Sequence, residues 1–175
     1  AIGTASTAAS AEIGLRMAHG YPAGHPYHTV AETMAEQLAE CTNGEVRIDI
    51  YPGSQLGNEA SMNEQVRIGG IDIIQTAHLW SANSYPPIGV NALPYLFRDR
   101  EHAISYLDSD VKRELIAGFN EETGMQMLSV AYQGAFNIST RGVAIESIED
   151  VEGLRIRAPD TDLFMAFPPA IGAVA

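Results

Sequence analysis

Two arginines near the end of the sequence have a spacing suited to binding an anion. Arg155 and Arg157 flank Ile156 in a segment with the pattern of a strand, so we expect their side chains on one face. The planar guanidinium group holds a carboxylate through two parallel hydrogen bonds and does not lose its charge. The pattern therefore indicates capture of a carboxylate. From the residues alone, a solvated strand face or a surface ion pair explains the spacing slightly better. The possible partners of such an ion pair are Glu146, Glu149 and Asp150.

Three histidines close together in the sequence suggest a different chemistry. His19, His25 and His28 could bind a transition metal through their imidazoles, but their spacing matches no standard metal motif. A small secreted hydrolase or metalloenzyme that uses these histidines is the alternative from another class, although the chain has no Gly-x-Ser-x-Gly sequence. Glycine-rich phosphate loops are absent as well, so we expect neither a nucleotide enzyme nor a bound cofactor.

The composition excludes several kinds of partner. The chain of 175 residues carries 10 Lys and Arg against 22 Asp and Glu, which gives a net charge of −12. Such an acidic chain offers no basic face to nucleic acid or to an anionic membrane surface. No apolar run approaches the ~18 residues of a membrane-spanning helix, so we expect a soluble protein without direct membrane insertion. The one cysteine, Cys41, is expected to be a small buried residue.

The first residues have the character of a processed leader. Residues 1–11 are small and uncharged and contain the small-x-small pattern of Ala9, Ser10 and Ala11. This composition is typical of the end of an export signal, and a disordered leader is the alternative.

Strand patterns recur along the chain as apolar or alternating runs that end at turn residues. They are Ile13–His19, Val46–Tyr51, Ile71–Ala77, Met125–Tyr132, Phe136–Thr140 and Leu154–Ala158.

Helical patterns lie between these runs. A capping box formed by Thr29 and Glu32 predicts the start of one helix, and Asn43-Gly44 predicts its end. The predicted buried face of this helix consists of Val30, Met34, Leu38 and Cys41. Further helices are predicted for 58–69, for the segment from Asp99 to Leu107, and for the segment from Ser109 or Asp110 to Thr123, with Gly124 as the stop.

The segment from His78 to Pro94 is predicted to be a long connection. It holds Trp80 and Tyr85, which suit either stacking against a ligand or packing against the neighbouring prolines.

The alternation of strands and helices predicts an α/β fold with a parallel or mixed sheet wrapped by helices. Such sheets bind ligands beyond the carboxyl ends of their strands. The positions expected there are 18–21, 53–59, 77–80, 133–137 and 157–160.

Five short motifs occur in one order between Ile13 and about Ala175. They are Tyr51-Pro52-Gly53-Ser54-Gln55-Leu56-Gly57, Gly69-Gly70-Ile71-Asp72, Leu93-Pro94-Tyr95-Leu96-Phe97, Ala131-Tyr132-Gln133-Gly134 and Gly153-Leu154-Arg155-Ile156-Arg157-Ala158-Pro159. With these motifs the chain resembles the substrate-binding subunit of tripartite ATP-independent periplasmic (TRAP) transporters.

The resemblance implies a fold and a role. The fold would be an α/β, two-lobed clamshell of the periplasmic-binding-protein kind (type II-like), with mixed sheets flanked by helices. Lobe I would cover residues 12–131, and residues 132–175 would begin a lobe II that is incomplete, because family members continue beyond this point. The protein would not be an enzyme. It would capture a small organic acid in the periplasm and deliver it to the TRAP membrane subunits; a clamshell protein of an ABC importer or a sensor is the nearest alternative.

The resemblance also assigns residues to the ligand site. The arginine that grips the ligand carboxylate in the family corresponds to Arg157, and the family's acidic residue that faces the ligand corresponds to Glu59. The remaining predicted ligand-binding residues are His19, His78, Trp80, Phe136 and Asn137.

Two departures from the sialic acid binders of the family bear on the ligand. Phe136 and Asn137 stand where those proteins carry a second arginine, and the glutamate they carry near Ala77 is absent. These differences speak against a sialic acid. They leave open a small dicarboxylate, a sugar acid, or an apolar or aromatic monocarboxylate.

Overall fold

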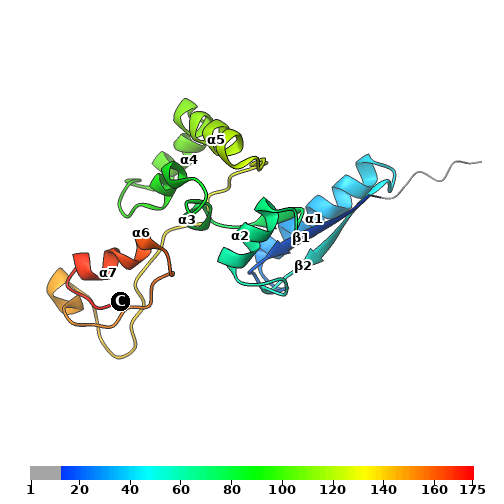
Figure 1. The fold of residues 1–175 in the computed structure, drawn as a ribbon. Helices are drawn as coiled ribbons and strands as arrows, with labels where there is room; N and C mark the ends of the chain where they lie inside the picture. Colours follow the sequence, from blue (N-terminus) through cyan, green and yellow to red (C-terminus); the bar gives the residue numbers. More distant parts are fainter. Residues whose placement is uncertain (1–12) are drawn as a thin grey trace, which may run out of the picture. The chain divides into compact units, whose positions relative to one another are not determined.

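In the computed structural model, which describes residues 13–175, the chain forms two compact units (Figure 1). The first unit ends at Thr76 and the second begins at Ala77. This division differs from the predicted lobe boundary after residue 131, which stays a prediction. The predicted leader, residues 1–11, lies outside the described residues.

The first unit is built on a three-stranded parallel sheet. Its strands are β1 (Ile13–His19), β2 (Val46–Tyr51) and β3 (Ile73–Gln75), in the order β2-β1-β3. The alternating patterns predict β1 and β2 at these bounds, whereas β3 is shorter than the predicted run. Because the strands are parallel, their carboxyl ends meet at one edge of the sheet.

Two helices pack on opposite faces of this sheet. Alternate residues of a strand point to opposite faces, so neighbouring residues of β1 belong to different cores. Met17 packs with Ala31 of α1 (Pro26–Cys41), whereas Ala18 packs with Met62 of α2 (Glu59–Arg67). The same alternation places His19 on the α1 side and Gly20 on the α2 side.

Helix α1 begins one turn earlier than the capping box predicts. Its N-cap is His25, whose Nδ1 accepts a hydrogen bond from the Tyr27 N–H at 3.2 Å, and Pro26 occupies the first helical position. Proline suits this position because its missing N–H would have no partner there. Thr29 therefore lies inside the helix and is not its cap. The predicted end holds, since Asn43 and Gly44 both have positive φ.

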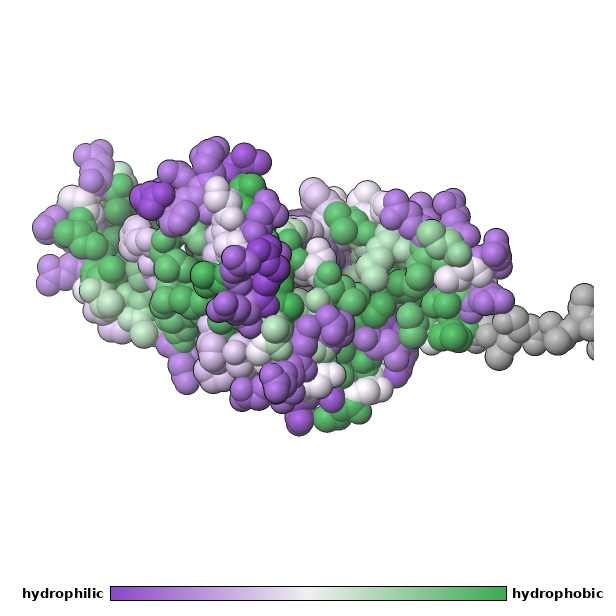
Figure 2. Space-filling view, turned by 90° about the horizontal axis from the view of Figure 1, so that it is seen from above, coloured by the Kyte–Doolittle hydropathy of each residue, from purple (hydrophilic) through white to green (hydrophobic). Residues whose placement is uncertain are grey.

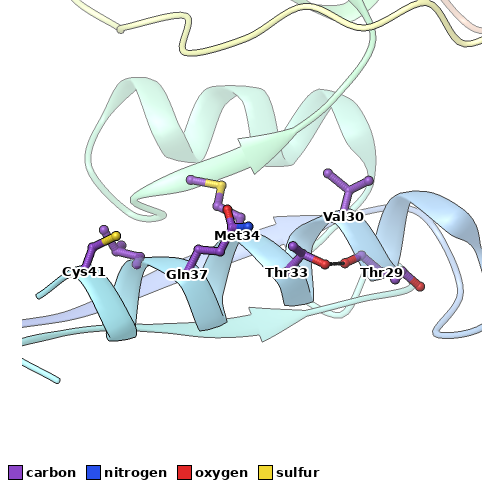
Figure 3. Close-up of a pocket in the computed structure, with 7 residues that line it drawn as sticks. Thr29, Val30, Thr33, Met34, Gln37 and Cys41 are labelled. Atoms are coloured by element: carbon purple, nitrogen blue, oxygen red, sulfur yellow. Dashed lines mark hydrogen bonds between the residues drawn. The ribbon is translucent and has the colours of Figure 1, made fainter. Parts of the chain in front are cut away.

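The predicted buried face of α1 is also partly wrong. Ala31 is the helix residue of the core cluster, with Met34 and Leu38 packed against it, while Val30 is 56% exposed and Cys41 is exposed. Small Ala31 lets the helix approach the sheet closely. The exposed apolar side chains line a shallow groove along α1 with Thr29, Thr33 and Gln37 (Figure 3). Figure 2 shows apolar residues interspersed with polar ones on the face that it presents.

The regular elements of the second unit are helices. The predicted long connection after Thr76 folds into α3 (His78–Ser81) and the 3-10 helix η1 (Pro86–Ala92). Next come α4 (Arg100–Leu107), capped by Asp99, and α5 (Asp110–Thr123), capped by Ser109 and ended by Gly124 with φ 71°, as the sequence predicts. The remaining elements are the 3-10 helix η2 (Ile148–Val151), α6 (Asp162–Met165) and α7 (Phe167–Ala170).

The strands predicted for Met125–Tyr132 and Phe136–Thr140 do not form. Residues 125–140 have no regular secondary structure, and residues 131–140 are all exposed. An apolar extended segment becomes a strand only where a neighbour pairs with it, and no neighbour among the described residues pairs with this one.

The strand predicted for Leu154–Ala158 is reduced to an isolated parallel bridge between Arg155 and Val174. The Ile156 N–H donates to the Val174 carbonyl oxygen at 2.8 Å, and the Val174 N–H donates to the Leu154 carbonyl oxygen at 2.8 Å. The α6 and α7 helices connect the two paired segments, so this region has the order of a short βαβ unit.

Candidate functional site

The carboxyl edge of the first sheet carries a half-buried carboxylate. Glu59 is the first residue of α2, whose N-cap Asn58 accepts a hydrogen bond from the Ser61 N–H at 2.9 Å. The Thr76 hydroxyl, just beyond β3, donates to Glu59 Oε2 at 2.6 Å. Helix start and strand end thus hold the Glu59 carboxylate where the sheet fold predicts a ligand.

A buried amide stands behind this contact. Asn63 is 5% exposed, and its Nδ2 donates to the Glu59 backbone oxygen at 2.9 Å and to Thr76 Oγ1 at 3.1 Å. Since an amide NH₂ carries two hydrogens, both bonds form together. Thr76 accepts from Asn63, and its single hydrogen points to Glu59.

Gly20 approaches the carboxylate from β1. Its N–H donates a hydrogen bond to Glu59. A Cβ atom at this position would lie 2.6 Å from Glu59 Oε1, closer than real Cβ contacts allow. A side chain at position 20 would therefore push the Glu59 carboxylate out of its present place.

The pKa of Glu59 reflects this mixed environment. Burial raises the pKa above its usual value, and the hydrogen bonds from Thr76 and Gly20 act in the opposite direction. Burial outweighs the two donors, so Glu59 gains a proton at higher pH than an exposed glutamate does.

His19 lies at the end of β1, as predicted, but its side chain is fully buried. Its Nδ1 accepts from the Tyr21 N–H at 3.2 Å, and its Nε2 lies 3.1 Å from Nδ1 of His28. Burial and the neighbouring imidazoles of His28 and His25 lower its pKa. Both ring nitrogens form hydrogen bonds within the protein, so the imidazole has no free nitrogen for a ligand. His19 therefore stabilises the carboxyl edge of the sheet from below.

The alternative prediction of a metalloenzyme requires side chains that converge on a metal ion. Within residues 13–175, no three His, Cys, Asp or Glu side chains converge to hold a metal ion. His25 stacks on Tyr21 at a centroid distance of 4.5 Å, and His28 lies 3.3 Å from Glu32. The three histidines therefore serve as a helix cap and as a buried hydrogen-bonded pair.

Arg157 lies in the second unit, in the segment that bridges to Val174. Leu154, Ile156 and Ala158 are half-buried while Arg155 and Arg157 are exposed, which confirms the predicted common face of the two arginines. Neither guanidinium group has a hydrogen bond or an ion pair among the described residues. Asp150, one possible partner, instead accepts from the N–H groups of Glu146 and Ser147 at 2.9 and 2.8 Å.

The other predicted residues of this unit occupy two places. Phe136 is 72% exposed and packs edge-on against Phe164 of α6 at a centroid distance of 5.1 Å; Asn137 beside it is exposed. His78 and Trp80 lie in α3 and are half-buried. His78 Nδ1 is 3.0 Å from the Asn91 amide nitrogen, and burial lowers the pKa of His78.

The predicted site residues thus fall into two groups. Glu59 and His19 share the edge of the first unit, and the other five belong to the second unit. Asn63 and Thr76 were not predicted as site residues, whereas Gly20 lies within the positions 18–21 that the sequence places at the ligand-binding edge. Two signals in the sequence point to Asn63 and Thr76: Asn63 lies one helical turn after Glu59, and Thr76 is the second-last residue of the third predicted strand.

The chain matches a known protein family over most of its length. The model of bacterial extracellular solute-binding protein family 7 matches residues 17–175. The 2,3-diketo-L-gulonate-binding periplasmic protein YiaO of Escherichia coli K12 is 29% identical over 168 residues, which cover 96% of this chain and 51% of YiaO. The sialic acid-binding periplasmic protein SiaP of Vibrio cholerae is 29% identical over 179 residues, covering 99% of this chain and 54% of SiaP.

Solved structures of TRAP solute-binding proteins also match this chain over most of its length. A TRAP periplasmic solute-binding protein from Xanthobacter autotrophicus Py2, with bound β-D-galacturonate, has a TM-score of 0.84 and 32% identity, covering 92% of this chain and 53% of that one. Another from Citrobacter koseri, with bound D-glucuronate, has a TM-score of 0.77 and 29% identity, covering 93% and 55%. The chain spans about half the length of the curated relatives it matches.

These matches confirm the resemblance that the five motifs indicate, together with the two-lobed α/β fold of the structural neighbours. The family is one of solute-binding proteins and not of enzymes, as predicted. Its description as extracellular and the two periplasmic relatives agree with the predicted location in the periplasm. In residues 13–175, no helix combines the length and apolar character needed to cross a membrane.

Proposed function

This chain belongs to family 7 of the bacterial extracellular solute-binding proteins, and we propose that it captures a sugar acid of the hexuronate class for a TRAP transporter. In this proposal Arg157 binds the ligand carboxylate, and Glu59 accepts hydrogen bonds from ligand hydroxyls. The captured acid is then delivered to the TRAP membrane subunits. No step of this role requires a cofactor.

The observation that carries the proposal is the free guanidinium group of Arg157. Of the other eight arginines, Arg16, Arg47, Arg67, Arg100 and Arg113 form ion pairs with carboxylates, whereas Arg98, Arg141 and Arg155 form none among the described residues. Arg157 has no such partner, although acids outnumber bases by 22 to 10. An arginine left unpaired in so acidic a chain is available to an anion from solution.

The charge of the whole chain makes this local cation necessary. A net charge of −12 repels an anionic ligand at long range, so the attraction must come from a group that touches it. Removal of one partner of a hydrogen-bonded charge pair in an interface typically costs about 2–5 kcal/mol.

The proposed class of ligand follows from the chemistry of Glu59. Glu59 is a half-buried acceptor, and an acceptor of this kind suits a ligand that carries hydroxyl donors. A hexuronate carries several such hydroxyl donors beside its carboxylate. Bound galacturonate and glucuronate in two similar structures support this choice over an apolar acid.

Thermal-shift measurements with a panel of acids test the proposal. We expect D-galacturonate and D-glucuronate to raise the melting temperature of the protein, because a ligand that binds only the folded state stabilises it. Neutral D-galactose, which lacks the carboxylate, should leave it unchanged. A rise with D-galactose equal to that with D-galacturonate would refute the role of the arginine.

We also propose Phe136 and Asn137 as ligand-binding residues, because an exposed aromatic ring and an exposed amide can contact a sugar ring. His78 and Trp80 stay proposals as well, on α3. His19 is proposed as a supporting residue.

A further inference from the structure

The Glu59 carboxylate is the end of a hydrogen-bond chain that runs from Asn63 through Thr76. We propose that Asn63 and Thr76 are positioning residues, which orient Glu59 and keep it ionised so that it accepts the hydroxyl groups of a sugar acid. This inference rests on the proposed function, since it concerns the same site.

The number of hydrogens on each donor group fixes the direction of this hydrogen-bond chain. The Asn63 amide gives its two hydrogens to the Glu59 backbone oxygen at 2.9 Å and to Thr76 Oγ1 at 3.1 Å. Thr76 has one hydrogen, which it directs to Glu59 Oε2 at 2.6 Å. A proton on Oε2 would bring two hydrogens together at this contact, so the Thr76 donor excludes protonation of this oxygen.

The geometry also fixes where the carboxylate lies. The Gly20 N–H donates to Glu59 from one side, and Thr76 donates from another. A side chain at position 20 would displace the carboxylate, because its Cβ would lie 2.6 Å from Oε1. Both oxygens keep further lone pairs, and a carboxylate whose protein contacts are all donors accepts only donors from a ligand.

Burial opposes the ionised state, which explains why donors are needed. The hydrogen bonds from Thr76 and Gly20 lower the pKa of Glu59, against the larger effect of its burial. Without the Thr76 donor, Glu59 would gain its proton at still higher pH and would then offer a ligand a hydroxyl in place of an acceptor.

The other ionisable groups on the elements around Glu59 are engaged elsewhere. His19 of β1 faces His28, Tyr51 of β2 packs against the α2 core, Asp72 before β3 pairs with Arg16, and Glu64 of α2 pairs with Arg67. Among the described residues, the groups that lower the pKa of Glu59 against the effect of burial are therefore the Thr76 hydroxyl, which Asn63 orients, and the Gly20 N–H.

The test compares Thr76→Val, which keeps the shape and removes the hydroxyl, with Thr76→Ser, which keeps the hydroxyl. Thr33→Val is the matched control, because the Thr33 hydroxyl donates to the Thr29 backbone oxygen on α1 and touches no carboxylate. Carboxyl-carbon NMR titration of the unliganded natural protein follows Glu59 directly. We expect the pKa of Glu59 to rise in Thr76→Val and to keep its original value in Thr76→Ser and Thr33→Val.

Calorimetry with D-galacturonate supplies the functional half of the test. We expect Thr76→Val to bind about tenfold more weakly near pH 7, with the loss of affinity on acidification moved to higher pH, and Thr76→Ser to bind as the unsubstituted protein does. An unchanged pKa of Glu59 and unchanged affinity in Thr76→Val would overturn the inference. If the unsubstituted protein failed to bind D-galacturonate, the proposed ligand class would fall; the NMR titration would still decide whether Thr76 tunes Glu59.

Discussion

The buried pair of His19 and His28 makes the stability of the first unit depend on pH. His19 Nδ1 accepts from the Tyr21 N–H, so the proton of the neutral ring sits on Nε2, which donates to Nδ1 of His28 at 3.1 Å. His28 then directs its own Nε2 proton to Glu32 at 3.3 Å. Each group in this series of hydrogen bonds donates to the next. An extra proton on His19 Nδ1 would face the Tyr21 N–H and remove its acceptor.

The sign of the effect follows from the lowered pKa of His19. In the unfolded chain this histidine binds a proton near its ordinary pKa of 6.5, whereas in the folded protein burial, with His28 and His25, lowers that pKa. Below pH 6.5 the unfolded chain therefore binds more protons. The contribution of His19 to the free energy of unfolding is complete above this pH and decreases as the pH falls toward the lowered pKa. One proton corresponds to at most about 1.4 kcal/mol per pH unit.

Urea denaturation followed by far-UV circular dichroism, from about pH 7.5 to about pH 5.5, measures this slope. His19→Gln keeps an N–H donor toward His28 but does not titrate. We expect it to lower stability by about 1 kcal/mol near pH 7.5, because the Tyr21 N–H loses its acceptor, and to flatten the acid-dependent loss. His102→Gln, on α4, is the matched control and should keep the slope. Parallel pH profiles for His19→Gln and the unsubstituted protein would refute the reasoning.

Three further predictions concern single positions. Gly20→Ala should weaken D-galacturonate binding about tenfold or more with the fold intact by circular dichroism, because the new Cβ displaces Glu59, whereas Gly14→Ala, which has open space around it, should bind normally; equal affinities in calorimetry would contradict the placement of Glu59. Arg157→Lys should also bind D-galacturonate much more weakly, since an ammonium group cannot form the two parallel bonds, and full affinity would argue against a bidentate contact. Cys41 should react with a thiol reagent in the native protein nearly as fast as in the denatured protein, and strong protection would mean that it is covered.

Local signals in the sequence predict much of the fold. The caps Asp99 and Ser109 and the stop at Gly124 act through atoms within a few residues, so their helices form where predicted. The alternation in β1 and β2 also suffices, because each strand presents a set of apolar side chains on one face, Leu15 and Met17 in β1 and Ile48 and Ile50 in β2. The start of α1 was missed because His25 and Pro26 provide an earlier cap than Thr29 does.

Features that depend on distant partners could not be predicted in this way. The apolar run from Met125 to Tyr132 looks like a strand, yet pairing decides whether it becomes one. Helical spacing showed apolar positions on α1 but not that Ala31, rather than Val30 or Cys41, meets the sheet.

The same distinction applies to the candidate site. The resemblance identifies Arg157 and Glu59, because both lie within short motifs or just after them. The groups that hold Glu59 lie far away in the sequence: Thr76 follows it by 17 residues, and Gly20 lies well before it, directly after β1. Their role depends on the parallel order of the sheet, which brings strand ends and the start of α2 together.

Calorimetric titration of D-galacturonate into the natural protein, Arg157→Ala and Arg155→Ala tests the central proposal most directly. The two arginines are matched, since both are exposed on one segment and neither has a partner among the described residues. We expect Arg157→Ala to lose about 2–5 kcal/mol of binding free energy, with unfolding unchanged within about 0.5 kcal/mol, and Arg155→Ala to bind almost normally. Near-wild-type affinity in Arg157→Ala, or equal losses in both variants, would contradict the assignment of Arg157 as the carboxylate-binding residue.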